Sequence, residues 1–122
     1  MLFDTKTFHA LEGGLNASWL QQQVVSQNLS NLETPNYKTK SVQFQDLLNK
    51  NMQGSSATSG DYAFQTSVNT EGNTNNRLDE NNVDSDEQSM ELYKSYVQYS
   101  YLTSKMNSQF SNFKYVVTNA FK

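Results

Sequence analysis

The sequence has 122 residues, which is enough for one small domain or one elongated unit. Only 35% of the residues are hydrophobic and 17% are charged, so polar uncharged residues dominate and a globular core would be small. The net charge of −3 with scattered lysines argues against the basic surface typical of nucleic-acid binding, and the absence of cysteine excludes disulfides, thiolate catalysis and cysteine-based zinc sites.

Other classes of site also find little support in the residues. His9 is the only histidine, and no glycine-rich phosphate loop occurs. The acidic residues between positions 79 and 87 have no central glycine, so we interpret them as a linker and helix cap rather than a calcium loop. No apolar run reaches the ~20 residues that span a bilayer, and the N-terminus lacks the pattern of a cleavable signal peptide. We expect no catalytic residue, cofactor, metal or small-molecule substrate.

The N-terminal segment, residues 1–33, is predicted to form a long amphipathic helix. Between residues 5 and 32, apolar side chains recur at spacings of three and four, which is the period of one helix face and of a coiled-coil seam. The seam positions are Phe8, Leu11, Leu15, Ser18, Gln22, Val25, Leu29 and Leu32.

Two features of this segment modify the predicted helix. Gly13 and Gly14 each cost about 1 kcal/mol relative to alanine in a helix. We therefore expect a weak or kinked beginning and a firm helix from about Leu15. Pro35 ends the helix, because proline disfavours helical geometry at the residue before it.

The middle segment, residues 34–82, is predicted to be largely irregular. Apolar residues at positions 44, 47 and 48 suggest a short helix near residues 43–51. The glycine- and serine-rich residues 54–60 suggest a flexible loop that tolerates insertions, and the polar residues 69–76 suggest a second mobile loop. One strand of a small β-hairpin is predicted from an alternating pattern at Tyr62, Phe64, Thr66 and Val68.

The C-terminal segment, residues 83–122, carries the strongest helix signal. Asp84 with Glu87 three residues later forms a capping box, and Asp86 adds negative charge near the positive end of the helix. No glycine or proline interrupts the following ~36 residues, which predicts a helix of about 54 Å. The seam positions are Leu92, Tyr96, Tyr99, Thr103, Met106, Phe110, Phe113, Val117 and Ala120.

These segments predict a mainly α fold, in which long N- and C-terminal helices pair as a coiled-coil-like unit beside an irregular middle with a short helix and a small β-hairpin. Apolar burial on two helices offsets only part of the entropy cost of ordering them, so we expect the pair to be marginal alone and to need neighbouring subunits. A self-sufficient helical hairpin is the alternative that the pattern leaves open. A second apolar flank, which one partner helix cannot cover together with the seam, comprises Met90, Tyr93, Val97 and Tyr101.

One segment resembles a known family. Residues 28–38, Asn-Leu-Ser-Asn-Leu-Glu-Thr-Pro-Asn-Tyr-Lys, are similar to the N-terminal motif N-I-A-N-x-x-T-P-G-Y-K of the flagellar axial proteins, which comprise rod, hook and hook-associated proteins. The matching positions are Asn28, Leu29, Asn31, Thr34, Pro35, Tyr37 and Lys38. From the residues alone, we expect Asn28 and Asn31 to bond carbonyls at the helix end or a neighbouring helix, and Tyr37 to fold back with its hydroxyl in water.

Further features resemble the proximal rod proteins of that family. The chain is short, and residues 77–84, Arg-Leu-Asp-Glu-Asn-Asn-Val-Asp, are similar to the family's R-x-D-G-N-N-V-D, which leads into the C-terminal helix. Asn36 and Glu80 stand where the family has glycine, and Gln21 stands where it often has arginine. Asparagine tolerates a positive φ, whereas glutamate is less suited to a left-handed position.

The resemblance implies a structural subunit of the bacterial flagellar basal-body rod, which transmits torque and is no enzyme. Such proteins leave the cytoplasm through the flagellar type III export apparatus without a cleaved signal and act outside the cytoplasmic membrane. The implied partners are copies of this chain, other rod subunits, membrane-ring and rod-adaptor proteins at the rod base, and the export apparatus. The implied assembly seam comprises Leu15, Val25, Leu29, Leu32, Leu92, Tyr96, Tyr99, Met106, Phe110, Phe113 and Val117.

One alternative of another class is a small secreted helical-hairpin binding module of the WXG type. It shares the small size, the two helices and the missing signal peptide. However, Trp19 is followed by Leu20 and Gln21, and it lies inside the predicted helix rather than at a hairpin turn.

Overall fold

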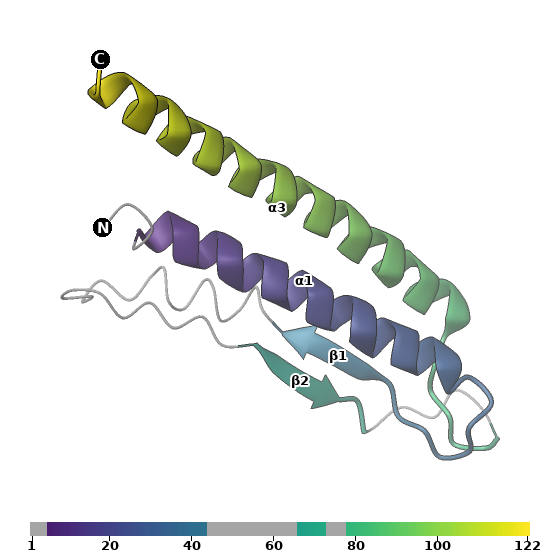
Figure 1. Ribbon diagram of the computed structural model, residues 1–122. Coiled ribbons are helices and arrows are strands. Elements are labelled where there is room, and N and C mark those ends of the chain that lie inside the picture. Colours follow the sequence, from purple (N-terminus) through teal and green to yellow (C-terminus); the bar gives the residue numbers. More distant parts are fainter. Residues whose placement is uncertain (1–4, 44–65, 73–77) are drawn as a thin grey trace.

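Two long helices and a two-stranded sheet make up the described part of the chain. A computed structural model of the protein describes residues 5–43, 66–72 and 78–122 (Figure 1). Helix α1 spans Lys6–Ser30, strand β1 spans Lys40–Gln43, strand β2 spans Ser67–Thr70 and helix α3 spans Ser85–Ala120. Helix α1 lies between α3 and the sheet (Figure 1). The predicted fold, mainly helical with a small antiparallel sheet in its middle, is confirmed.

Helix α3 begins where the capping pattern places its start. The side chain of Asp84 accepts hydrogen bonds from the backbone N–H groups of Asp86, at 2.9 Å, and Glu87, at 3.3 Å. These two acidic residues also lie in the first turn, where the helix dipole favours negative charge. The helix then continues for 36 residues, in agreement with the uninterrupted apolar period of the sequence.

Helix α1 is continuous, and the expectation of a weak beginning is wrong. The side chain of Thr5 caps the helix by accepting a hydrogen bond from the N–H of Phe8 at 3.2 Å. The helix passes without interruption through Gly13 and Gly14, and both are buried. A residue without a side chain allows neighbouring segments to approach the helix backbone closely, and the resulting burial offsets the entropic cost of glycine.

The two strands pair antiparallel, with Lys40 opposite Thr70 and Val42 opposite Val68. Strand β1 was not predicted as a strand, and Gln43, which the predicted short helix included, is its last residue. The remainder of that predicted helix lies outside the described residues, as does the loop at residues 54–60.

The predicted hairpin strand is confirmed at its end. Val68 belongs to β2, Thr66 lies just before that strand, and Tyr62 and Phe64 lie outside the described residues. Asn69 and Thr70 were expected in a mobile loop, but they extend β2, because β1 offers them pairing partners.

The fully buried interior is small and unusually polar. Among the described residues, the buried hydrophobic side chains are Ala17, Val24, Val25 and Val83. The largest side chains with almost no exposure are instead Asn28, Asn81 and Ser95. Near the N-terminus of α1, the rings of Phe8 and Phe110 meet edge to face, with centroids 6.0 Å apart. No helix in the described ranges has an apolar stretch long enough to cross a membrane.

Candidate functional site

Three buried asparagines join the segments at the end of the molecule where α1 finishes and α3 begins. We call Asn28, Asn81 and Asn82 the asparagine clasp. A buried amide is costly unless its donors and acceptors find partners. No buried side-chain nitrogen or oxygen in the described part of the chain lacks a partner, so the clasp is a satisfied network.

Asn28 connects α1 to both of its neighbours. Its Nδ2 donates to the carbonyl oxygen of Lys40 and to Oε1 of Gln88, both at 2.8 Å. Its Oδ1 accepts from the hydroxyl of Tyr37 at 3.0 Å and from the N–H of Lys40 at 3.1 Å. One fully buried amide therefore uses its whole hydrogen-bonding capacity to bind α1 to β1 and to the first turn of α3.

Asn81 closes the C-terminal end of α1. Helix α1 ends at Ser30, and the carbonyls of its C-cap Asn31 and of the turn that follows it lie beyond the helix and need other donors. The Nδ2 of Asn81 donates to the carbonyl oxygens of Asn31 at 2.9 Å, Leu32 at 3.2 Å and Thr34 at 2.8 Å. Its Oδ1 accepts from the N–H of Val83 at 2.8 Å, so the approach to α3 is fixed by the end of α1.

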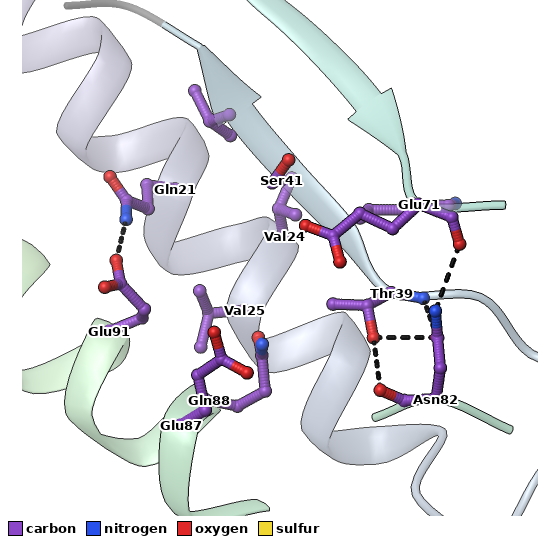
Figure 2. Close-up of a pocket in the computed structure, with 12 residues that line it drawn as sticks. Gln21, Val24, Val25, Thr39, Ser41, Glu71, Asn82, Glu87, Gln88 and Glu91 are labelled. Carbon is purple, nitrogen blue, oxygen red and sulfur yellow. Dashed lines mark hydrogen bonds between the residues drawn. The ribbon is translucent and has the colours of Figure 1, made fainter. Parts of the chain in front are cut away.

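Asn82 ties the sheet to the same loop (Figure 2). Its Oδ1 accepts from the N–H of Thr39 at 2.6 Å and from the hydroxyl of Thr39 at 2.9 Å. Its Nδ2 donates to the carbonyl oxygen of Glu71 at 3.0 Å. Because Thr39 precedes β1 and Glu71 follows β2, one amide holds both strands at the base of α3.

Two left-handed residues allow the loops to meet. Asn36 and Glu80 both have φ of 61°. The N–H of Asn36 donates to the carbonyl oxygen of Asp79 at 2.9 Å, and Nζ of Lys38 donates to the carbonyl oxygen of Glu80 at 2.6 Å. The structure therefore requires a positive φ at both positions where the family motif carries glycine. Asparagine adopts it readily, whereas glutamate stores backbone strain of about 1–2 kcal/mol.

The motif residues are largely brought together here. Asn31 bonds the helix-end carbonyl of Gln27 at 2.7 Å, and its Oδ1 accepts from the hydroxyl of Thr34 at 3.0 Å. The expectation for Tyr37 is wrong in one respect, because its hydroxyl donates to Asn28 rather than to water. Burial raises the pKa of Tyr37 above its ordinary value. Pro35 is exposed, and Leu29 is half-buried on α1.

Sequence reasoning missed several members of this network. It treated Asn81 and Asn82 as part of a linker, and it assigned no role to Thr39 or Gln88. The signal available was the pair of adjacent asparagines that stands one residue before the helix cap Asp84. Asparagine is usually exposed, so a single sequence does not show that these amides are buried.

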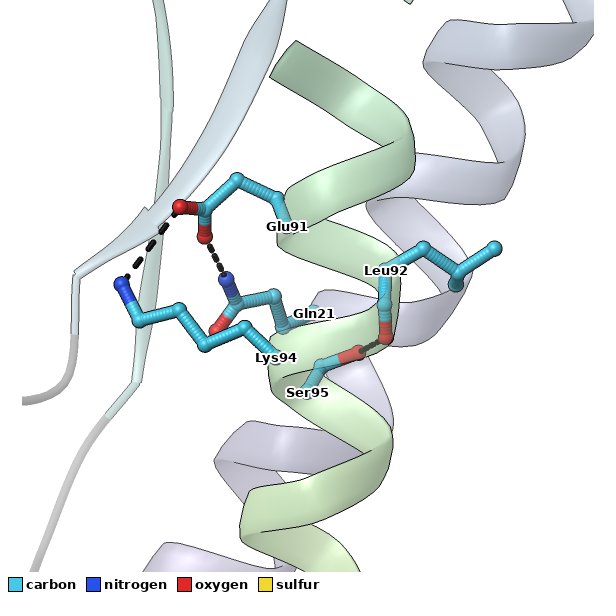
Figure 3. Close-up of polar contacts among 5 residues, drawn as sticks. All are labelled: Gln21, Glu91, Leu92, Lys94 and Ser95. Carbon is cyan, nitrogen blue, oxygen red and sulfur yellow. Dashed lines mark hydrogen bonds and ion pairs between the residues drawn. The ribbon is translucent and has the colours of Figure 1, made fainter. Parts of the chain in front are cut away.

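A polar contact extends the connection between the helices beyond the clasp (Figure 3). The Nε2 of Gln21 donates to Oε2 of Glu91 at 2.7 Å, and Lys94 lies 3.4 Å from the other carboxylate oxygen. Gln21 stands where the family often has arginine, and although it is uncharged it still donates a hydrogen bond to a carboxylate. Ser95, one turn later, is fully buried and donates to the carbonyl of Leu92 at 2.7 Å, so its small side chain lets α1 approach α3 closely.

The seam residues are covered unevenly. The residues of α3 with full burial are Gln88 and Ser95, and Tyr96 beside them keeps 55% of its surface exposed. On the seam, Val25 is buried and Leu15, Leu29, Leu32, Leu92, Met106 and Phe113 are half-buried, while Tyr99, Phe110 and Val117 are exposed. The contact between the helices therefore leaves much of the aromatic surface of α3 open.

The second apolar flank lies on the outer face of α3. Its members are spaced by three and four residues and keep between 51% and 75% of their surface exposed. We call this set the outer stripe; it consists of Met90, Tyr93, Val97 and Tyr101.

A cleft of about 340 Å³ lies beside the clasp, between α1, β1 and the start of α3 (Figure 2). Its wall carries the carboxylates of Glu71, Glu87 and Glu91 together with Lys40. No group of metal-binding side chains occurs in the described part of the chain. Amides, carboxylates, hydroxyls and the lysine share the lining with three valines, Val24, Val25 and Val42, and no cysteine or histidine lines the cleft.

Comparison with known proteins gives one informative similarity. No protein-family model matches the chain. The flagellar basal body rod protein FlgB of Bacillus subtilis (strain 168) is 33% identical over 120 residues, and the alignment covers 92% of this chain and 93% of that protein. The similarity therefore extends over almost the whole of both chains.

Proposed function

Because this chain belongs to the family of the flagellar basal body rod protein FlgB, we propose that it is a structural subunit of the proximal rod, which assembles through its terminal helices and transmits torque for motility. The observation that carries the proposal is the 33% identity across 92% of the chain.

The structure supports the proposal in two ways. First, the asparagine clasp fixes the two helices relative to each other by directional hydrogen bonds, as a subunit that transmits force requires. Second, α3 exposes aromatic side chains along its length, and such surfaces are typical of protein–protein contacts.

The proposed partners follow from the rod position. They are copies of this chain and other rod subunits, the membrane-ring and rod-adaptor proteins at the rod base, and the flagellar export apparatus. We propose that the chain leaves the cytoplasm by that apparatus without signal-peptide cleavage and functions outside the cytoplasmic membrane. The structure gives no support to the WXG-type alternative. Trp19 is half-exposed and lies within α1, not at a turn between helices.

Locating the protein tests the proposal. An epitope inserted within residues 54–60, where composition predicts tolerance, should leave cells motile and appear in purified basal bodies. Deletion of the gene should give non-motile cells whose basal bodies lack a rod. Motile deletion cells, or a functional tagged chain absent from basal bodies, would contradict a rod function.

A further inference from the structure

One side-chain amide in the cleft beside the clasp lacks a partner. Gln88 keeps only 5% of its surface exposed, and its Oε1 accepts from Nδ2 of Asn28. Its Nε2 has no acceptor among the described residues. Every fully buried side-chain nitrogen or oxygen in that part of the chain has a partner, so this nitrogen reaches a surface, and the surface that Gln88 lines is the cleft. A donor in this position needs an acceptor that enters the cleft.

The edge of β1 that faces away from β2 also has free hydrogen-bonding groups. The N–H and C=O of Lys40 bond the side chain of Asn28, at 3.1 and 2.8 Å, where a neighbouring strand would otherwise lie. Backbone groups of a strand alternate in direction, so those of Val42 point the same way as those of Lys40. Val42 lines the cleft, and no side chain of the described residues bonds its backbone. An unpaired strand edge is a template for a further strand.

Two carboxylates at the cleft have no cation beside them. Glu71, on the sheet side, and Glu87, on α3, are exposed, and neither side chain forms an ion pair within the described ranges (Figure 2). The third carboxylate, that of Glu91, is 3.4 Å from Lys94, and Lys40 also lines the cleft. With both lysines counted, one negative charge is left over, which suits a single cationic group.

These groups together define the ligand by its chemistry. A bare metal cation offers no acceptor to Nε2 of Gln88, and an anion such as phosphate would be repelled by the carboxylates. An extended peptide with a lysine or arginine satisfies all of them. Its carbonyls accept from Gln88, its backbone pairs with the edge of β1, and its cationic group reaches the carboxylates. The apolar stem of such a side chain packs on valines, which the cleft supplies as Val24, Val25 and Val42.

We propose that the cleft binds an extended segment of another protein, which adds to the free edge of β1 and places one lysine or arginine between Glu71 and Glu87. The only lysine in a strand of the described part is Lys40, whose Nζ already lies 3.4 Å from Oε1 of Gln27, so the segment comes from a different chain. The volume of about 340 Å³ is near the lower end of the ~300–1,000 Å³ of ligand pockets, so it accommodates one such side chain. This interaction goes beyond the rod function and does not depend on it.

A peptide titration tests the site. The probe is an acetylated, amidated pentapeptide of sequence VTRTV, added to the full-length chain labelled with ¹⁵N. The side-chain amide signal of Gln88 and the backbone signal of Val42 should shift. Citrulline in place of arginine keeps the shape and removes the charge, so it should weaken binding about fivefold. N-methylation at one of two neighbouring peptide residues should weaken binding and at the other should not, because only alternate N–H groups face the adjacent strand.

Variants of the chain test the same contact from the other side. Glu71→Gln combined with Glu87→Gln should weaken binding of the arginine peptide about fivefold and leave the citrulline peptide unaffected. Both sites are exposed, so helicity by circular dichroism should be kept. The control combines Asp86→Asn with Glu12→Gln, which removes the same number of charges at exposed positions outside the cleft and should bind the peptide normally.

Other results would overturn the proposal. Equal binding of the arginine and citrulline peptides would show that the carboxylates recognise no cation. Equal binding of the pentapeptide and of acetylated, amidated arginine alone would show a small-molecule site without strand addition. Self-association of the chain that the double glutamate variant abolishes would identify the occupant as a second copy. Each of these results leaves the rod function standing, because that function rests on the sequence similarity.

Discussion

At the scale of residues, the asparagine clasp depends on amides that use both their donors and their acceptors. Asn28 joins four groups, and replacing it by an apolar residue would leave the partly buried hydroxyl of Tyr37 and N–H of Lys40 without that partner. A buried polar group without a partner costs more than the net value of the hydrogen bond it has lost.

The substitution Asn28→Ala should therefore lower the free energy of unfolding by about 3 kcal/mol. Urea denaturation of the isolated chain measures the change. Asn16→Ala is the matched control, because Asn16 is exposed on the same helix and should change stability by less than about 0.5 kcal/mol. Equal effects of the two substitutions would contradict a special role for the buried amide.

Glu80 is a site where stability can be gained. Its φ of 61° is unfavourable for glutamate and costs glycine nothing. Glu80→Gly should raise the free energy of unfolding by about 1 kcal/mol. Glu80→Ala removes the same side chain but keeps a Cβ atom, so a similar gain with alanine would show that the left-handed backbone is not the cause. Thermal denaturation of the unmodified chain, Glu80→Gly and Glu80→Ala measures these differences in stability.

Tyr37 should make stability depend on alkaline pH. Burial raises the pKa of its hydroxyl above the ordinary 10.0, so the folded state prefers the protonated form. This contribution is complete below about pH 10 and is lost as the pH rises through the raised pKa. Tyr37→Phe should lower stability by about 1 kcal/mol at neutral pH and should weaken the loss above pH 10.

The control for this pH dependence is Tyr93→Phe, at an exposed tyrosine. Its free energy of unfolding, measured at neutral and alkaline pH, should follow that of the unmodified chain. If the stability of Tyr37→Phe fell above pH 10 as much as that of the unmodified chain, the pH dependence would come from other groups.

At the scale of elements, the helices and strands that could be predicted are those whose position is set by residues close together in the sequence. The start of α3 at Asp84 follows from a cap and an uninterrupted apolar period, both of which are local. Strand β1 has no such signal, since it reads Lys-Ser-Val-Gln and gains its place from hydrogen bonds to Asn28 and from pairing with β2. The continuity of α1 through Gly13 and Gly14 likewise depends on burial, which a propensity scale does not contain.

Part of the candidate site could likewise be predicted from the sequence. The turn after α1 and the helix-end role of Asn31 follow from the motif and from the unpaired carbonyls of any helix end. The partners of Asn28 lie 9, 12 and 60 positions away, so no helical or strand period indicates them.

The far part of the helix pair gives a prediction about assembly. Phe110 contacts the ring of Phe8, and Phe113 is half-buried one turn further along α3. Phe110→Asp combined with Phe113→Asp places two charges on this face, so incorporation into basal bodies and motility should be lost while export continues. Ser111→Asp with Asn112→Asp adds the same charges at exposed positions between them and should be tolerated. Motile cells carrying the double phenylalanine change would contradict the predicted seam.

At the scale of the whole molecule, polar side chains are buried and large apolar side chains are exposed, which reverses the usual arrangement. Asn28 and Asn81 are fully buried, whereas Tyr93, Tyr101 and Phe121 are mostly exposed. The described part of a single chain therefore buries few apolar side chains, and burial by neighbours would add stability by mass action.

The isolated chain should accordingly gain stability with concentration. At low concentration its thermal transition should be broad, and hydrogen exchange should be slow at the clasp and fast in residues 111–120. At high concentration the midpoint should rise and those residues should become protected. A sharp transition that does not depend on concentration, with both regions protected, would indicate a self-sufficient monomer.

The clasp lies at one end of the helix pair, and this position gives the subunit mechanical leverage. Helix α1 has 25 residues and a length of about 37 Å, so each degree of tilt at the clasp displaces its far end by about 0.6 Å. An adjustment too small to break the hydrogen bonds of the three asparagines thus becomes an ångström-scale shift where Phe8 meets Phe110. In the proposed rod, such a shift would let identical chains fit neighbours that are not spaced identically.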